Sequence, residues 1–190
     1  MGPARVLGLV ICILLLGGVV NAETEIVSHS LDYTDDIYFA EPGAILDHSP
    51  WYRGSWEDWG WTHDMSGDVP ANASGIEWAV LSIDAWDVDA IDGESDVIYV
   101  NGIGVGTLDD SGGRYWQTSY FTLPTSLVNE LWQTGDLSVY IDIDADNTGQ
   151  RVTLGGSWLT VAYTVGAIPE PATIGLLGIG GLMLLRRRRR

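Results

Sequence analysis

The fold class of this chain is decided by the stretch VIYVNGIGVGTL at residues 97–108. Its first four residues are β-branched or aromatic, which favours an extended strand. Asn101-Gly102 follows, and this pair is the strongest two-residue signal for a hairpin, because both residues tolerate positive φ angles. Ile103 to Leu108 supplies the returning strand. The stretch therefore predicts an antiparallel β-hairpin.

A second strong strand signal lies at residues 137–144, where apolar and polar side chains alternate strictly. Alternation with a period of two is typical of a strand with one buried face. Weaker runs of the same kind predict further strands at residues 25–31, 36–40, 75–86, 116–123, 151–154 and 158–165.

Only Thr125 to Gln133 has helical character, with Leu127 and Leu131 at i,i+4, Thr125 or Ser126 as N-cap and Gly135 after the end. Many short strands separated by Gly, Asp and Asn turns predict an all-β domain, an antiparallel β-sandwich of jelly-roll type. No fixed repeat is present, which argues against a propeller or a solenoid.

The order of segments from residue 79 onward supports this architecture. Ala79-x-Leu81-x-Ile83 comes first, followed by Asp87-Val88-Asp89, the strand and hairpin at 96–102, a Trp- and Thr-containing strand, and the alternating strand. This order resembles the galactose-binding-like jelly-roll modules of exported bacterial proteins. The resemblance covers roughly residues 76–165 and implies the fold, and it assigns no sugar-binding residue.

The composition of residues 23–167 is strongly acidic, with 25 Asp and Glu, 3 Arg and no Lys, a formal net charge of −22. Such a surface repels nucleic acid and anionic membranes. The acidity is explained either by solubility and salt tolerance or by bound divalent cations. Cys12 is the one cysteine of the chain and lies before this region, so disulfides and thiolate metal sites are excluded from it.

The N-terminus has the three parts of a secretory signal peptide. Arg5 supplies a positive charge, Val6 to Val20 is apolar, and Val20-Asn21-Ala22 fits a small-residue cleavage site. We therefore expect a signal helix over residues 1–22, cleavage by signal peptidase, and a mature N-terminus at Glu23.

The C-terminus also has three parts in order. An apolar run of fourteen residues, Ala172 to Leu185, would span about 21 Å as a helix, which is short of the ~30 Å bilayer core. Terminal arginines favour the cytoplasmic side and extend toward the lipid headgroups. The run is preceded by Pro169, Glu170 and Pro171 and followed by Arg186, Arg187, Arg188, Arg189 and Arg190.

These three parts resemble the PEP-CTERM sorting signal of bacterial exported proteins. The resemblance implies that an exosortase recognises the Pro-Glu-Pro region, removes the tail after transient membrane contact, and releases or attaches the protein outside the cell. An ordinary tail anchor is the alternative. The predicted organisation is a signal peptide at 1–22, an acidic β-sandwich at 23–167 and a sorting signal with a short hydrophobic helix at 168–190.

Two acidic clusters are candidate Ca²⁺ sites, because Ca²⁺ prefers six to eight oxygen ligands. The first lies within positions 84–96 and has the candidate ligands Asp87, Asp89, Asp92, Glu94 and Asp96. The second consists of Asp142, Asp144 and Asp146 and begins like an EF-hand loop, but Asn147 and Thr153 replace its glycine and its final glutamate. The alternative for both is a solvated strand face with its turn.

An aromatic segment provides a third candidate site. Aromatic faces stack on sugar rings, so the segment could bind carbohydrate; alternatively, its indoles form part of the core. The candidate ligand-binding residues are Trp51, Trp56, Trp59 and Trp61.

Catalysis is a further alternative, in the form of a small glycoside hydrolase. Glu57, Asp58, His63 and Asp64 are available as acids and bases. The sequence contains no H-E-x-x-H, G-x-S-x-G or phosphate-binding glycine motif. We therefore expect a non-catalytic structural or binding protein of the cell surface or extracellular polymer layer, with carbohydrate binding as the first alternative.

Overall fold

The computed structural model describes residues 22–35, 39–41, 44, 48, 50–166 and 178. The chain divides into two units, one of residues Glu23–Gly166 and one that contains Met1–Ala22 and Ala167–Arg190. Apart from Ala22 and Gly178, the predicted signal helix and the predicted C-terminal hydrophobic helix lie outside the described residues. Within those residues, no helix has the length and apolar character needed to cross a membrane.

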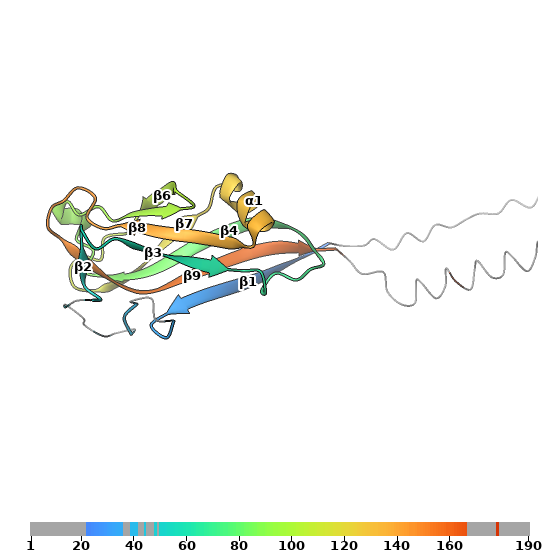
Figure 1. The fold of residues 1–190 in the computed structure, drawn as a ribbon, viewed down its shortest axis with the longest axis horizontal. Helices are drawn as coiled ribbons and strands as arrows, with labels where there is room; N and C mark the ends of the chain where they lie inside the picture. Colours follow the sequence, from blue (N-terminus) through green and yellow to red (C-terminus); the bar gives the residue numbers. More distant parts are fainter. Residues whose placement is uncertain are drawn as a thin grey trace, which may run out of the picture. The chain divides into compact units, whose positions relative to one another are not determined.

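The unit Glu23–Gly166 is a sandwich of two antiparallel sheets (Figure 1). The first sheet has the strand order β1-β9-β4-β7, with the short β2 paired to β9, and the second has the order β3-β8-β5-β6. Apolar side chains of both sheets form one core. The strands are β1 Glu23–Asp32, β2 Arg53–Gly54, β3 Trp59–Asp64, β4 Ala73–Trp86, β5 Val97–Val100, β6 Ile103–Thr107, β7 Trp116–Thr122, β8 Asp136–Asp142 and β9 Arg151–Val165. The prediction of an all-β antiparallel sandwich is confirmed.

The hairpin predicted at residues 97–108 is present as β5 and β6. Asn101 and Gly102 have φ angles of 45° and 76°, the positive values that a tight hairpin turn of this type requires. β5 also pairs with β8, so the hairpin is joined to the alternating strand at the centre of the second sheet.

The alternation predicted for residues 137–144 holds only through β8, which ends at Asp142. Ile143 and Asp144 are both fully buried, although the pattern places them on opposite faces. The reason is that the chain leaves the ladder here, since Asp144 has a φ of 49°. The alternative interpretation of the second acidic cluster, a solvated strand face, is therefore wrong for Asp144, which is buried.

The two strands predicted at 151–154 and 158–165 are one continuous strand, β9. Gly155 and Gly156 lie between them and make room for indole rings instead of forming a turn. A Cβ atom on Gly155 would lie 2.7 Å from Cζ3 of Trp116, and one on Gly156 would lie 2.8 Å from Cη2 of Trp158. Glycine is required at both positions because of this close packing.

Two other expectations need correction. In the strand predicted at 36–40, residues 36–38 lie outside the described residues, and Phe39 and Ala40 are not in a strand. The helix is present as α1, Thr125–Thr134, and Gly135 ends it with a φ of 79°, but its N-cap is Pro124, which makes no side-chain hydrogen bond. Proline at this position provides an extended entry into the helix without a capping oxygen.

Candidate functional site

The two predicted acidic clusters meet at one end of the sandwich. The first follows β4 and leads to β5, with the short 3₁₀ helix η1, Ala90–Asp92, in the connection (Figure 1). The second follows β8 and leads to β9. Ala145 donates its backbone N–H to the carbonyl of Ser95 at 2.9 Å, and the N–H of Asp144 donates to Oδ1 of Asp96 at 2.9 Å. Segments about 50 residues apart in sequence thus share one local structure.

Glu94 and Asp96 lie at the centre of this structure and are 5% and 1% exposed. In each carboxylate one oxygen is held by a backbone N–H. Oε2 of Glu94 accepts from Asp89 at 2.5 Å, and Oδ1 of Asp96 accepts from Asp144. The other oxygens, Oε1 of Glu94 and Oδ2 of Asp96, are buried and have no hydrogen-bond partner among the described residues.

This environment opposes ionisation of both groups. Burial, together with the neighbouring Asp96 carboxylate, raises the pKa of Glu94 to about 8. Burial also raises the pKa of Asp96 to about 7, with Asp144, Asp142 and Asp58 contributing. Isolated buried carboxylates are stable only when they bind a proton or a cation.

Asp144 differs from Glu94 and Asp96, because both oxygens of its carboxylate accept hydrogen bonds from residues that follow it in the same loop. It accepts hydrogen bonds from the N–H and Oγ1 of Thr148 at 2.8 and 2.7 Å and from the N–H of Gly149 at 2.7 Å. Burial acts to raise the pKa of Asp144, but these hydrogen bonds outweigh it and lower the pKa. Asp144 is therefore an ionised, fully hydrogen-bonded group beside Asp96.

The other predicted metal ligands do not all join this pair. Asp87 is buried and accepts a hydrogen bond from the Tyr52 hydroxyl at 2.6 Å, with Arg114 Nε 3.9 Å away. Asp92 and Asp146 are exposed, whereas Asp89 and Asp142 are half-buried. Within the described ranges, no group of three or more His, Cys, Asp or Glu side chains is arranged to hold a metal ion. Any cation here would need oxygen ligands beyond side-chain carboxylates.

Asp58 is a part of this end that sequence reasoning placed elsewhere, among the catalytic alternatives. Its Oδ1 accepts from the N–H of Ile143 at 2.9 Å, and its Oδ2 accepts from the Tyr140 hydroxyl at 3.2 Å. It thereby holds the start of the loop after β8. Because Asp58 and Ile143 are 85 positions apart, no local signal in the sequence could have joined them.

The aromatic segment does not form a single platform. Trp61 is a core residue that packs edge-on against Phe39, with ring centroids 5.2 Å apart. Trp59 is half-buried beneath the guanidinium of Arg53, 4.4 Å from its ring centre. Trp51 is half-buried beside His48, and Trp56 is 85% exposed. The four tryptophans thus have different surroundings.

The remaining catalytic alternatives have structural partners. His63 is fully buried, with Nε2 2.8 Å from the Ser157 hydroxyl and Nδ1 3.0 Å from Nδ1 of His29. Burial lowers the pKa of His63 to about 3. Glu57 accepts from the N–H of Gly54 at 3.2 Å, and Asp64 accepts from the N–H of Ser66 at 2.9 Å.

The outer face of the second sheet carries a row of two glycines and two tyrosines. Gly60 of β3 pairs with Tyr140 of β8, Tyr140 with Tyr99 of β5, and Tyr99 with Gly104 of β6. The tyrosine ring centroids lie 6.2 Å apart. Both neighbours of the pair lack side chains, so this part of the face is open.

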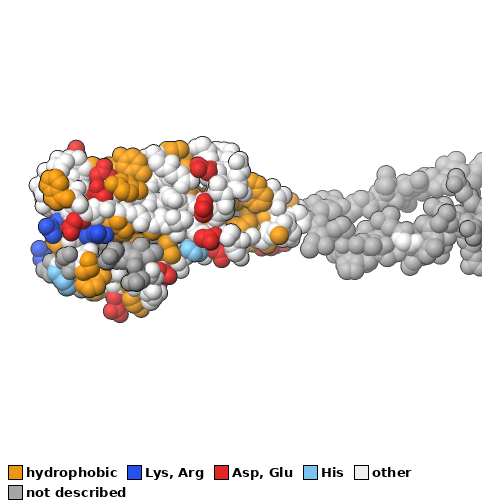
Figure 2. Space-filling model, viewed as in Figure 1, with side chains coloured by type: hydrophobic (Ala, Val, Ile, Leu, Met, Phe, Trp, Pro, Cys, Tyr) orange, Lys and Arg blue, Asp and Glu red, His pale blue; other side chains and the backbone are white. Residues whose placement is uncertain are grey.

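Charge is distributed unevenly over the surface. In Figure 2, acidic side chains are dispersed over the sandwich, whereas the arginines gather toward one end. Arg53 and Arg151 belong to the paired strands β2 and β9, and the guanidinium of Arg151 lies 6.0 Å from the Tyr52 ring centre. Each of the three arginines of this unit lies over an aromatic ring.

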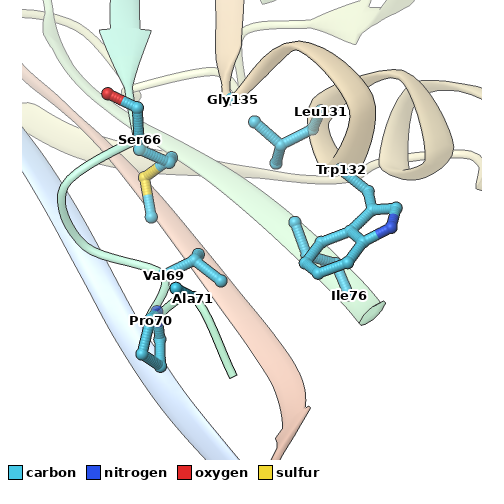
Figure 3. Close-up of a pocket in the computed structure, with 9 residues that line it drawn as sticks. Ser66, Val69, Pro70, Ala71, Ile76, Leu131, Trp132 and Gly135 are labelled. Atoms are coloured by element: carbon cyan, nitrogen blue, oxygen red, sulfur yellow. The ribbon is translucent and has the colours of Figure 1, made fainter. Parts of the chain in front are cut away.

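A small apolar pocket of about 180 Å³ lies beside α1 and contains none of the predicted site residues. In Figure 3, Trp132 and Leu131 of α1 lie on one side of it and Val69 and Pro70 of the loop after β3 on the other. Its lining offers little for the recognition of a polar ligand.

Comparison with known proteins assigns the C-terminus. Residues 167–190 match the PEP-CTERM protein-sorting motif. This match includes the predicted sorting residues at 169–171 and 186–190. The motif indicates an exported protein that is sorted by exosortase and linked to the cell envelope or surface.

The chain was also compared with solved structures and with curated proteins. One similar solved structure is the coat protein dimer of Tobacco streak virus, at 14% identity, with a TM-score of 0.33 and coverage of 78% of this chain and 90% of that chain. No curated protein shows significant similarity to the sequence. The role of the sandwich must therefore be argued from its own residues.

Proposed function

We propose that this protein is a non-catalytic structural or binding component of the cell envelope or extracellular polymer layer, and that Ca²⁺ stabilises its sandwich. The PEP-CTERM motif supports delivery to the outside through exosortase. The observation that carries the calcium part is the pair of buried oxygens, Glu94 Oε1 and Asp96 Oδ2, that lack a partner among the described residues.

The physical argument is one of charge. Two buried carboxylates close to Asp89 and Asp144 repel one another and have lost their hydration. A lysine ammonium could compensate this charge, but the chain has no lysine. A divalent cation compensates two charges at once and binds oxygen ligands readily.

Thermal unfolding of the sandwich unit tests this proposal. When the free Ca²⁺ concentration is one hundred times the dissociation constant of the site, binding should stabilise the fold by about 2.7 kcal/mol relative to the protein in chelator. Equal melting midpoints with Ca²⁺ and with chelator would show that the fold does not depend on the cation.

The proposal that the protein is non-catalytic rests on the hydrogen bonds that the candidate acids and bases already make within the fold. His63 is buried and linked to Ser157, while Glu57 and Asp64 accept backbone N–H groups. General acid–base catalysis requires such groups to reach a substrate. Turnover of any polysaccharide by the purified unit would contradict this part and support the small hydrolase.

Carbohydrate binding is the second candidate, and the open face around Tyr99 and Tyr140 favours it. Tyrosine rings offer apolar surface for stacking on sugars, and the hydroxyls of Thr62 and Ser138 lie in the next row of the same face. A polysaccharide array tests this function. Loss of a signal in Tyr140→Ala but not in Tyr120→Ala, an exposed tyrosine of the other sheet, would support it.

Processing has its own test in cells. Deletion of Pro169 to Pro171 should leave a longer, membrane-associated chain, because exosortase would no longer recognise the tail. Substitution of Asn21 with Ala is a matched control that keeps the predicted signal-peptidase site small. Normal tail removal from the deletion variant would contradict the role of the Pro-Glu-Pro residues.

A further inference from the structure

Two loops that cross between the sheets bring their carboxylates together at one end of the sandwich. They are residues 87–96, between β4 and β5, and residues 143–150, between β8 and β9. We infer that the two loops form one joint binding site for Ca²⁺, with the free oxygens of Glu94 and Asp96 as its side-chain ligands. This inference rests on the calcium stabilisation proposed above and replaces two separate clusters with a single site.

The first argument is the division of roles within each carboxylate. In both side chains a backbone N–H binds one oxygen and orients the group, while the second oxygen is left without a partner. Carboxylates that bind metals are commonly held by hydrogen bonds in this way. A purely structural carboxylate would instead use both oxygens, as Asp144 does.

The second argument is that the site needs both loops. Oδ1 of Asp96, in the first loop, is bound by the N–H of Asp144 in the second, and Ser95 and Ala145 add a backbone hydrogen bond next to it. The carboxylate of Asp144 is occupied by Thr148 and Gly149, so it contributes negative charge without being a ligand. The second loop therefore positions Asp96 and strengthens the attraction for a cation.

The donor atoms determine the class of cation. The charged groups that act on Glu94 and Asp96 are all carboxylates, namely Asp58, Asp89, Asp142 and Asp144. Without a nitrogen or sulfur ligand, the site favours a hard cation. Since no third His, Cys, Asp or Glu side chain joins the pair among the described residues, other oxygens, such as backbone carbonyls and water, must complete the shell. Ca²⁺ accepts such a flexible set of oxygens, whereas Mg²⁺ demands near-ideal octahedral geometry.

Calorimetric titration of residues 23–166 with Ca²⁺ tests the joint site, since this unit contains the whole sandwich core. Glu94→Gln and Asp96→Asn preserve the shape of each side chain and remove its charge. Each should weaken Ca²⁺ binding at least about tenfold. In chelator, both variants should melt no lower than the wild type, which separates loss of the ligand from failure to fold.

Matched controls come from the exposed carboxylates of the same loops, Asp92→Asn and Asp146→Asn. Both should bind Ca²⁺ like the wild type. If they lose binding while Glu94→Gln and Asp96→Asn keep it, the cation sits on the exposed carboxylates and the joint site is wrong, although calcium stabilisation stands. If the wild type binds no Ca²⁺, both the site and the stabilisation fail. Equal affinity for Mg²⁺ would overturn the choice of cation.

Discussion

The two ends of β8 lie in two differently stabilised ends of the sandwich. Its first residue, Asp136, follows α1, where Leu127, Val128 and Leu131 are buried against the core. Its last residue, Asp142, leads into the acidic loops around Glu94 and Asp96. One end is held by apolar burial and the other by polar loops with uncompensated charge. We therefore expect one end of this strand to be insensitive to cations and the other end to respond to them.

The largest effect is expected at the apolar end. Leu127→Ala removes a fully buried side chain of α1 and should lower the free energy of unfolding by about 2–5 kcal/mol, with and without Ca²⁺. Denaturant unfolding measures this change. Glu130→Ala, on the exposed side of α1, is the control and should have little effect. A calcium-dependent loss in Leu127→Ala would break the distinction between the two ends.

A gain is expected at the acidic end. In chelator at pH 8, Glu94→Gln should raise the free energy of unfolding by about 1–3 kcal/mol, because it removes a buried negative charge whose Oε1 has no partner among the described residues. The pKa of Glu94 is raised on folding from 4.5 to about 8, so the folded state holds the proton more tightly. Wild-type stability in chelator should therefore fall as the pH rises from about 4.5 to 8. A flat profile over this range would contradict the expected burial of charge.

His63 should produce the opposite pH dependence where β1 meets β3. Its pKa falls on folding from 6.5 to about 3, so its neutral form is favoured in the folded state. This contribution is complete above pH 6.5 and is lost as the pH falls, by at most about 1.4 kcal/mol per pH unit. Unfolding measured from pH 6.5 to 5 should show the loss in the wild type. A His63→Gln variant should lack it, and an identical slope in that variant would exclude His63 as the cause.

The smallest effect is expected for exposed charge at the acidic end. Asp146→Asn should change the free energy of unfolding by less than about 0.5 kcal/mol, because its side chain is exposed. Thermal melting in chelator measures this change. A large shift in the melting midpoint would mean that exposed carboxylates contribute as much electrostatic repulsion at this end as Glu94 and Asp96 do.

Local patterns predicted the elements of the fold well. The Asn101-Gly102 turn, the alternation through Asp142 and the glycine after α1 are each confirmed. The errors occurred where packing overrides a local pattern. Separate strands were predicted at 151–154 and 158–165, but Gly155 and Gly156 between them continue β9, and the rings of Trp116 and Trp158 lie against them.

The candidate site could be predicted only in part. The sequence identified two dense acidic segments, and Glu94, Asp96 and Asp144 were among their residues. The sequence could not distinguish the buried carboxylates from the exposed Asp92 and Asp146, because buried and exposed acidic residues follow one another at similar spacing within the same two segments. Burial depends on which loop covers which residue, and that is a property of the strand order.

By itself, the sequence determined the class of fold and the export of the protein, because a hairpin turn, a strand alternation and a sorting motif are each encoded within a few adjacent residues. Only the tertiary structure brought the two acidic segments together into one local structure and added Asp58 to it. The contacts responsible join residues 48 and 85 positions apart, Asp96 to Asp144 and Asp58 to Ile143. Such contacts exist only after β4, β5, β8 and β9 are arranged in two facing sheets, which places both connections at the same end.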